Sequence, residues 1–163
     1  MLDATLWIAQ IFLALFFLAA GLPKVLGRGI DRWVGFDRVP RPLTVLIGVS
    51  EAAAAVGLVV PMLVDEVQWA TPLAAMGLAA VCAMAAGFHL REQEWLPALE
   101  TVLWSSLAIV VVIGRWDELS TGPSISTDVL VPVIGLLVAA IVVNLAILFR
   151  QPLPTATADS VAS

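Results

Sequence analysis

Apolar residues occur along this chain in long runs, and polar residues are concentrated in the intervals between them. A helix that crosses the hydrocarbon core of a bilayer needs about 20 mostly apolar residues, within a range of about 17–25. Five segments meet this requirement, so each is predicted to be a transmembrane helix. They are Leu6–Leu26, Leu43–Leu63, Ala70–Leu90, Pro97–Gly114 and Val129–Phe149.

The positions of proline agree with these limits. Pro42, Pro72 and Pro97 stand near predicted helix starts, where a missing N–H costs little. Most connections are short, so neighbouring helices are predicted to be antiparallel and adjacent. The first connection, Gly27–Arg41, is interpreted as an aromatic and basic belt along the headgroups, or alternatively as a docking loop for a lipid or partner. The polar tail, residues 151–163, is predicted to be disordered.

Composition strengthens the membrane interpretation. The 163 residues are 61% hydrophobic with a mean hydropathy of +1.01, whereas a soluble domain is about 45–50% apolar. A small fold in water could not bury that excess, so the lipid bilayer is the expected environment. The net charge of −5 gives no generally basic surface, and no nucleic-acid partner is predicted. The single Lys beside seven Arg, with abundant Ala and Val, suggests a bacterial source.

The distribution of basic residues predicts the orientation. With five spans, one side of the membrane carries seven basic residues and the opposite side carries Arg115 alone. The positive-inside rule then places the N-terminus outside and the C-terminus in the cytoplasm of a multi-pass plasma-membrane protein. The seven are Lys24, Arg28, Arg32, Arg38, Arg41, Arg91 and Arg150.

One carboxylate lies deep in a predicted span. Glu51 is eight residues past Leu43, or roughly 12 Å into the membrane at about 1.5 Å per residue. A charge at the centre of a span costs about 2.5–3.5 kcal/mol on insertion scales. The residues beside Glu51 are small and would let another helix approach closely. They are Gly48, Ala52 and Ala55.

Three more ionisable residues are predicted to share the leaflet of Glu51. Lys24 and His89 end the first and third spans, and Glu100 lies in the first turn of the fourth. Side chains on a helix lean toward its N-terminus. The two carboxylates should therefore lean toward the cytoplasm, and Lys24 and His89 into the membrane. The pattern predicts an intramembrane polar cluster of these four residues, with Glu51 within reach of Lys24 or His89.

Each member also has a simpler interpretation. Lys24 could extend to the headgroups, Glu100 could complement its helix dipole, and His89 could be an ordinary interfacial histidine. Glu51 could form a structural ion pair or hydrogen bond without chemistry. Gln10 and Asn144 are candidates for hydrogen bonds between helices.

Several kinds of site have no sequence signal. Cys82 is the only cysteine, so the chain cannot perform dithiol–disulfide exchange within itself, and packing is its expected role. One histidine cannot supply a bis-histidine haem site, and no metal cluster, phosphate-binding glycine loop or Ser/His/Asp arrangement is recognisable. No catalytic residue, metal site or cofactor is therefore assigned.

The order of these features resembles the DoxX-like family of small bacterial membrane proteins, from about Trp7 to Trp116. The resemblance implies a four-helix membrane core, with Lys24, Glu51 and His89 at the family's recurrent Lys, Glu and His positions. Four stretches carry it in this order: LWIAQIFLALFFLAAGLPKVLG, IGVSEAAAAVGLVVP, LAAMGLAAVCAMAAGFHL and TVLWSSLAIVVVIGRW.

The resemblance also shapes the expected organisation and function. The chain is predicted to be an all-α membrane protein, with a four-helix core in 1–116, an additional C-terminal transmembrane helix with its preceding loop in 117–150, and the tail. The family is named from a subunit associated with thiosulfate:quinone oxidoreductase. The leading hypothesis is a non-catalytic subunit or scaffold of a membrane complex, redox complexes included, with a protein partner or a second copy. The alternative is a quinone- or lipid-linked oxidoreductase, or its catalytic subunit, with quinone as the conceivable cofactor.

Overall fold

The computed structural model describes residues 2–28, 39–122 and 126–150, and helices are the only regular structure in these ranges. The long helices are α1 (Leu2–Leu26), α2 (Arg41–Val59), α3 (Ala70–Arg91), α4 (Trp95–Gly114) and α5 (Thr127–Arg150). Three short 3₁₀ helices lie in the connections: η3 (Val60–Leu63), η4 (Asp65–Val67) and η5 (Trp116–Thr121).

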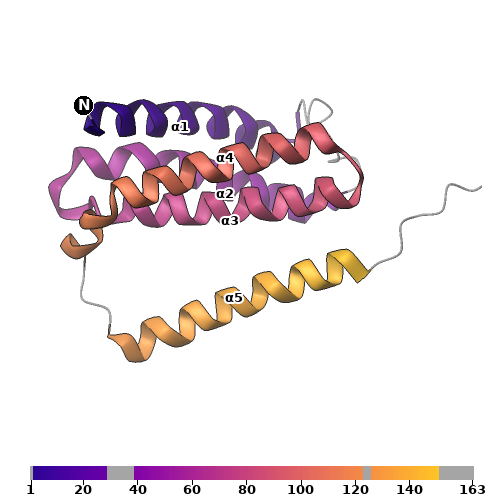
Figure 1. The fold of residues 1–163 in the computed structure, drawn as a ribbon. Coiled ribbons are helices and arrows are strands. Elements are labelled where there is room, and N and C mark those ends of the chain that lie inside the picture. Colours follow the sequence, from indigo (N-terminus) through magenta and orange to yellow (C-terminus); the bar gives the residue numbers. More distant parts are fainter. Residues whose placement is uncertain (1, 29–38, 123–125, 151–163) are drawn as a thin grey trace, which may run out of the picture.

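The first four long helices form an antiparallel bundle (Figure 1). Each packs against the next along the chain, and α1 contacts α4 to close the arrangement. All four are long and apolar enough to cross a membrane, with α2 continuing through η3 to Leu63. The four predicted spans of the core are thus confirmed as helices of membrane-spanning length.

The helix ends follow the prolines. Pro42, Pro72 and Pro97 occupy the second or third position of α2, α3 and α4, where backbone N–H groups have no partner within the helix. Pro61 acts at the other end of α2, because it has no N–H to donate to the preceding turn. There the α-helix narrows into η3, although the sequence pattern had predicted one continuous helix to Leu63.

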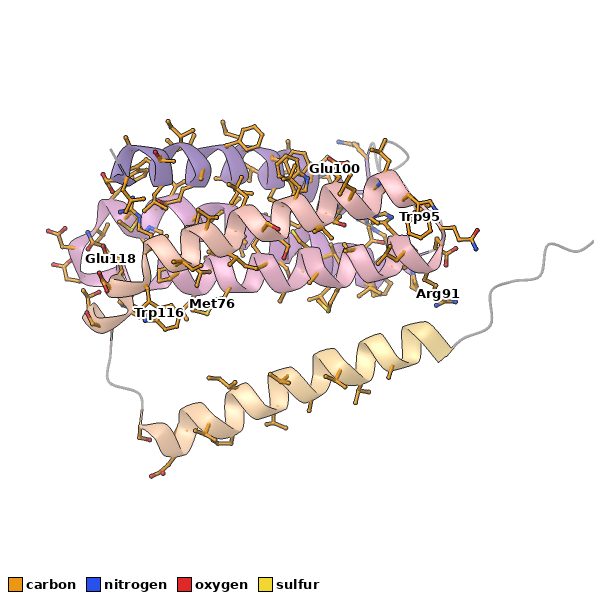
Figure 2. All side chains as sticks on the ribbon, viewed as in Figure 1. Met76, Arg91, Trp95, Glu100, Trp116 and Glu118 are labelled. Carbon is orange, nitrogen blue, oxygen red and sulfur yellow. The ribbon has the colours of Figure 1, made fainter. Side chains whose placement is uncertain are left out.

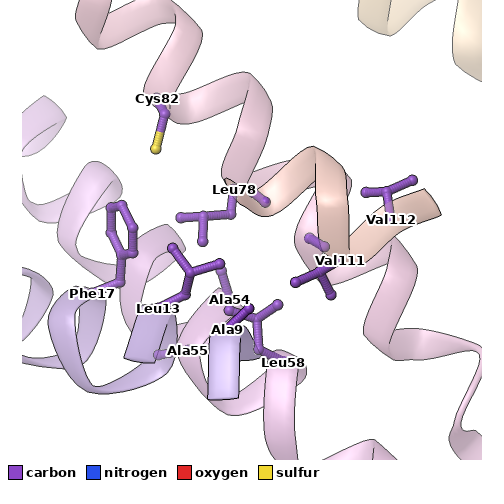
Figure 3. Close-up of a cluster of buried hydrophobic side chains, with 12 residues drawn as sticks. Ala9, Leu13, Phe17, Ala54, Ala55, Leu58, Leu78, Cys82, Val111 and Val112 are labelled. Carbon is purple, nitrogen blue, oxygen red and sulfur yellow. The ribbon is translucent and has the colours of Figure 1, made fainter. Parts of the chain in front are cut away.

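The core of the bundle is built from small and aliphatic side chains contributed by all four helices (Figure 3). Leu13, Leu58, Leu78 and Val111 are its fully buried larger side chains, and Cys82 packs among them. Many other large apolar side chains point outward. Such an exterior is unfavourable in water and expected in contact with lipid tails.

The fifth predicted span corresponds to a helix, because α5 contains the segment Val129–Phe149. It contacts α3 and is drawn on the α3 side of the bundle in Figure 1. That α5 crosses a membrane stays a prediction. The predicted disordered tail and the middle of the first connection, residues 29–38, lie outside the described residues.

Candidate functional site

Lys24 and Glu51 form a buried ion pair between α1 and α2. The ammonium Nζ donates to both carboxylate oxygens, at 2.6 Å to Oε1 and 2.7 Å to Oε2. Only 4% of the Lys24 side chain and 7% of the Glu51 side chain are exposed. The prediction that Glu51 lies inside the bundle, within ion-pair reach of Lys24 or His89, is confirmed with Lys24 as the partner.

Two glycines allow the helices to approach closely beside this pair. Gly21 lies three residues before Lys24, and Gly48 three residues before Glu51. A Cβ at Gly21 would lie 2.7 Å from the Gly48 carbonyl oxygen, and a Cβ at Gly48 would lie 2.7 Å from the Gly21 carbonyl oxygen. Because no side chain separates the two backbones, the charged groups one turn later need only a short reach.

Arg41 supports the same helix pair at its end. Its guanidinium donates to the carbonyl oxygens of Lys24 and Val25, the second at 2.8 Å from Nη2. These carbonyls belong to the last turn of α1, where the helix itself supplies no donor. The sequence pattern assigns Arg41 only to the basic residues that predict the orientation of the chain. Its position in the first turn of α2, the helix expected to pack antiparallel to α1, is the sequence signal for this contact.

His89 is paired with a residue outside the predicted polar cluster. Its Nδ1 lies 2.7 Å from Oε2 of Glu94. The connection between α3 and α4 is short, and Gln93 adopts a positive φ of 61° that reverses the chain. The Glu94 N–H then donates to the His89 carbonyl oxygen, which places both parts of Glu94 beside His89. The histidine closes this turn.

Glu100 lies on the exterior of α4. It is exposed, and its Oε1 accepts a 3.3 Å hydrogen bond from Nε1 of Trp104. The Trp104 ring packs on Phe16, with ring centroids 4.6 Å apart. Of the four residues predicted to cluster, the structure therefore joins Lys24 with Glu51 and gives His89 and Glu100 other contacts. Depth along a span was predictable, but the direction each side chain faces was not.

A second buried polar group lies at the other end of α1. Gln10 is fully buried, and its Nε2 donates to the Leu58 carbonyl oxygen at 2.6 Å. In the 3₁₀ pattern that carbonyl would bond to the N–H of residue 61, but Pro61 has none. The predicted interhelical hydrogen bond of Gln10 is confirmed. The side chain of Asn144 lies outside the described residues.

Arg115 completes this second group. Its Nε donates to Oε1 of Gln10 at 3.0 Å, and its Nη1 lies 2.6 Å from Oδ1 of Asp3. The guanidinium also lies over the Trp7 ring, 5.8 Å from the ring centroid. The sequence pattern does not predict this role, because Arg115 follows the last residue of α4 and is typical of an ordinary interfacial charge.

The described residues contain no group of three or more His, Cys, Asp or Glu that could hold a metal ion. The chemistry available at Lys24 and Glu51 is charge neutralisation and proton exchange within a desolvated pair. Because one ammonium engages both carboxylate oxygens, the pair also fixes how α1 and α2 sit along each other.

A comparison with known protein families matches nearly all of the four-helix bundle. The DoxX-like family matches residues 8–114, from the first turns of α1 to the last residue of α4, and α5 lies beyond the match. Searches of curated proteins and of solved structures found no match. The matched region holds Lys24, Glu51 and Gly48, and it covers well over half of the 163 residues. The chain belongs to the DoxX-like family of small membrane proteins.

Proposed function

We propose that this protein is a non-catalytic subunit or scaffold of a membrane complex. The observation that carries the proposal is the closed geometry of Lys24 and Glu51. Both carboxylate oxygens are engaged by one ammonium, and both side chains are buried. A pair satisfied internally in this way acts on the relation between two helices. A rigid bundle with an apolar exterior is a suitable surface for a partner protein or a second copy.

The alternative is a quinone- or lipid-linked oxidoreductase, in which the Glu51 carboxylate would exchange protons during turnover. The two functions differ in whether the Glu51 carboxylate must gain and lose a proton. A scaffold needs a side chain that accepts a hydrogen bond from Lys24 at this position, whereas a proton-exchanging site needs a carboxylate.

Glu51→Gln separates these roles, because glutamine retains an oxygen that accepts from Lys24 but does not titrate. We expect the variant to insert and to recover the same co-purifying proteins, or the same oligomer, as wild type in mild detergent. Mass spectrometry and size-exclusion chromatography would measure both. Glu66→Gln, in an exposed turn, is the matched control. Loss of a quinone-reducing activity in Glu51→Gln, with assembly unchanged, would decide for the enzyme.

We further propose that the protein resides in a bacterial plasma membrane with α5 as a fifth span, the N-terminus outside and the C-terminus in the cytoplasm. The seven-to-one distribution of basic residues supports this orientation. Reporter fusions in the Gly27–Arg41 connection and after Arg150 should report a cytoplasmic location, and a fusion at Asp65 an external one. An external signal from Gly27–Arg41 would overturn the orientation. If α5 crosses the membrane, the Asp65 and Arg150 fusions must report opposite sides. If it does not, they report the same side.

A further inference from the structure

Arg115 is a buried cation whose hydrogen-bonding capacity is incompletely used. Only 8% of its side chain is exposed. Its Nε is bonded to Gln10 and its Nη1 to Asp3, but its Nη2 is buried without a hydrogen-bond partner among the described residues. An unsatisfied buried donor costs about 1–3 kcal/mol, and more when it is charged. A group of this kind points to a missing acceptor.

The present anion on Arg115 is replaceable. Asp3 belongs to the first turn of α1, and 68% of its side chain is exposed. It bonds to Nη1, whereas a guanidinium fork is best satisfied when an oxyanion engages two N–H groups side by side. Asp3 can turn toward solvent without leaving a buried charge of its own. The Asp3 carboxylate therefore resembles a stand-in for a bidentate oxyanion.

The rest of the fork is held in place. Gln10 is fixed by its bond to the Leu58 carbonyl oxygen, so its own oxygen faces Nε of Arg115. Gly114 lies against Leu6, where a Cβ would collide with the leucine side chain. This close approach of α4 to α1 brings Arg115 to Gln10. An incoming oxyanion would thus meet an orientated guanidinium and lose little free energy in ordering it.

The surroundings select the kind of oxyanion. Asp117 and Glu118 lie two and three residues after Arg115, in the first turn of η5, and the Glu118 backbone N–H donates to the Arg115 carbonyl oxygen at 3.1 Å. Figure 2 shows Glu118 and Trp116 at one end of the bundle, with Arg91 and Trp95 at the other. The two acidic residues would repel a simple anion but attract an adjacent cation. Tryptophans at both ends are typical of the headgroup region.

We propose that Arg115 binds the phosphate of an ethanolamine phospholipid headgroup. The phosphate replaces Asp3 and engages Nη1 and Nη2, while the ammonium of the same headgroup is bound by Asp117 and Glu118. A zwitterionic headgroup satisfies the orphaned cation and the acidic residues together, and ethanolamine, unlike choline, has N–H groups that donate hydrogen bonds to the Asp117 and Glu118 carboxylates. This site is independent of the proposed function, since either a scaffold or an enzyme could carry it.

The test uses the full chain in detergent micelles doped with a palmitoyl-oleoyl lipid at equal mole fraction: phosphatidylethanolamine, phosphatidylglycerol or phosphatidylcholine. Native mass spectrometry measures lipid retention, and thermal unfolding measures Tm. We expect phosphatidylethanolamine to be retained roughly tenfold more than the other two, the change that one charge-assisted hydrogen bond produces. Equal retention of the three lipids would overturn the proposal.

Variants test the individual contacts. Arg115→Gln should abolish the preference for phosphatidylethanolamine, and Glu118→Gln should reduce its margin over phosphatidylglycerol. Asp3→Asn should raise retention several-fold by removing the competing carboxylate, which keeps the test decisive if Arg115→Gln does not fold. Arg28→Gln, at an exposed arginine beyond the other end of α1, is the control and should change nothing.

Two further results would contradict the proposal. One is lower phosphatidylethanolamine retention in Asp3→Asn. The other is an equal rise in Tm from inorganic phosphate without lipid, if that rise also disappears in Arg115→Gln. The second result would assign the fork to a soluble oxyanion in place of a lipid.

Discussion

The two ends of α1 both bind a neighbouring helix through a buried charge, but they do so differently. At the α2 contact, Lys24 and Glu51 are buried together and hold each other through two short bonds. At the α4 contact, Arg115 is buried, yet its partner Asp3 is largely exposed and Nη2 of Arg115 has no acceptor among the residues that the structure describes. The carboxylate bound to Lys24 is therefore enclosed, whereas the carboxylate bound to Arg115 can be replaced by another anion.

The difference shows that burial of a charge does not by itself indicate function. In a closed pair, the attraction between the two ions offsets the free energy lost when both are desolvated. The main contribution of such a pair is to specify helix register, which is an attested use of buried ion pairs in some proteins. In the open contact, only one ion, Arg115, is desolvated. The open end is therefore the better place to look for a ligand, although Glu51 was the more prominent residue in the sequence.

The largest expected effect comes from breaking the closed pair. Lys24→Met leaves Glu51 buried without its cation, and loss of one partner from a buried pair costs about 3–5 kcal/mol. Asp3→Asn, at the open end, should lower stability by less, about 2 kcal/mol at most, because the asparagine oxygen can still accept from Nη1 of the buried Arg115 and only the charge of a largely exposed carboxylate is lost. Reversible unfolding in mixed detergent micelles would measure both free energies.

The double variant Lys24→Met/Glu51→Leu sharpens this comparison. It removes both charges, so most of the stability lost in Lys24→Met should return. If the double variant were as unstable as Lys24→Met, the pair would contribute more to the free energy of unfolding than the neutralisation of one charge by the other. Equal losses for Lys24→Met and Asp3→Asn would remove the distinction between the two ends.

A smaller effect is expected from the glycines beside the closed pair. Gly48→Ala places a Cβ 2.7 Å from the Gly21 carbonyl oxygen and 2.8 Å from Cβ of Lys24, so the helices must move apart. Overpacking of this kind costs about 1–3 kcal/mol. Gly77→Ala is the matched control on α3, because a Cβ there meets nothing within 4 Å. The same unfolding measurement should show that Gly77→Ala is neutral or slightly stabilising; a loss equal to that of Gly48→Ala would contradict the close-approach argument.

The sequence predicted those features that depend on depth and on one helix at a time. The four spans followed from run length. That Glu51 would meet Lys24 or His89 followed from their shared depth and opposed lean, but the choice of Lys24 did not. The direction in which the Glu100 side chain points depends on the rotation of α4 about its own axis. The length of an apolar run does not determine that rotation. The partner of His89 depends on the positive φ of Gln93, a residue with no strong sequence signal for that conformation.

Arg115 could not be predicted for a related reason. Its role requires that α4 approach α1 at Gly114 and that the end of α2 leave the Leu58 carbonyl oxygen for Gln10. Both conditions are contacts between segments far apart in the chain. The one local signal was Pro61, which leaves the Leu58 carbonyl oxygen without a backbone N–H donor. That signal does not indicate which side chain donates to this oxygen instead.

The bonds of Arg41 to the last turn of α1 have a mechanical consequence. They fasten the start of α2 to the end of α1, at the two points where the first connection leaves and rejoins the bundle. We therefore expect a change in the length of the connection to leave the relative position of α1 and α2 unchanged. Substitutions, insertions and deletions within residues 29–38 are therefore expected to leave the Lys24–Glu51 pair in place.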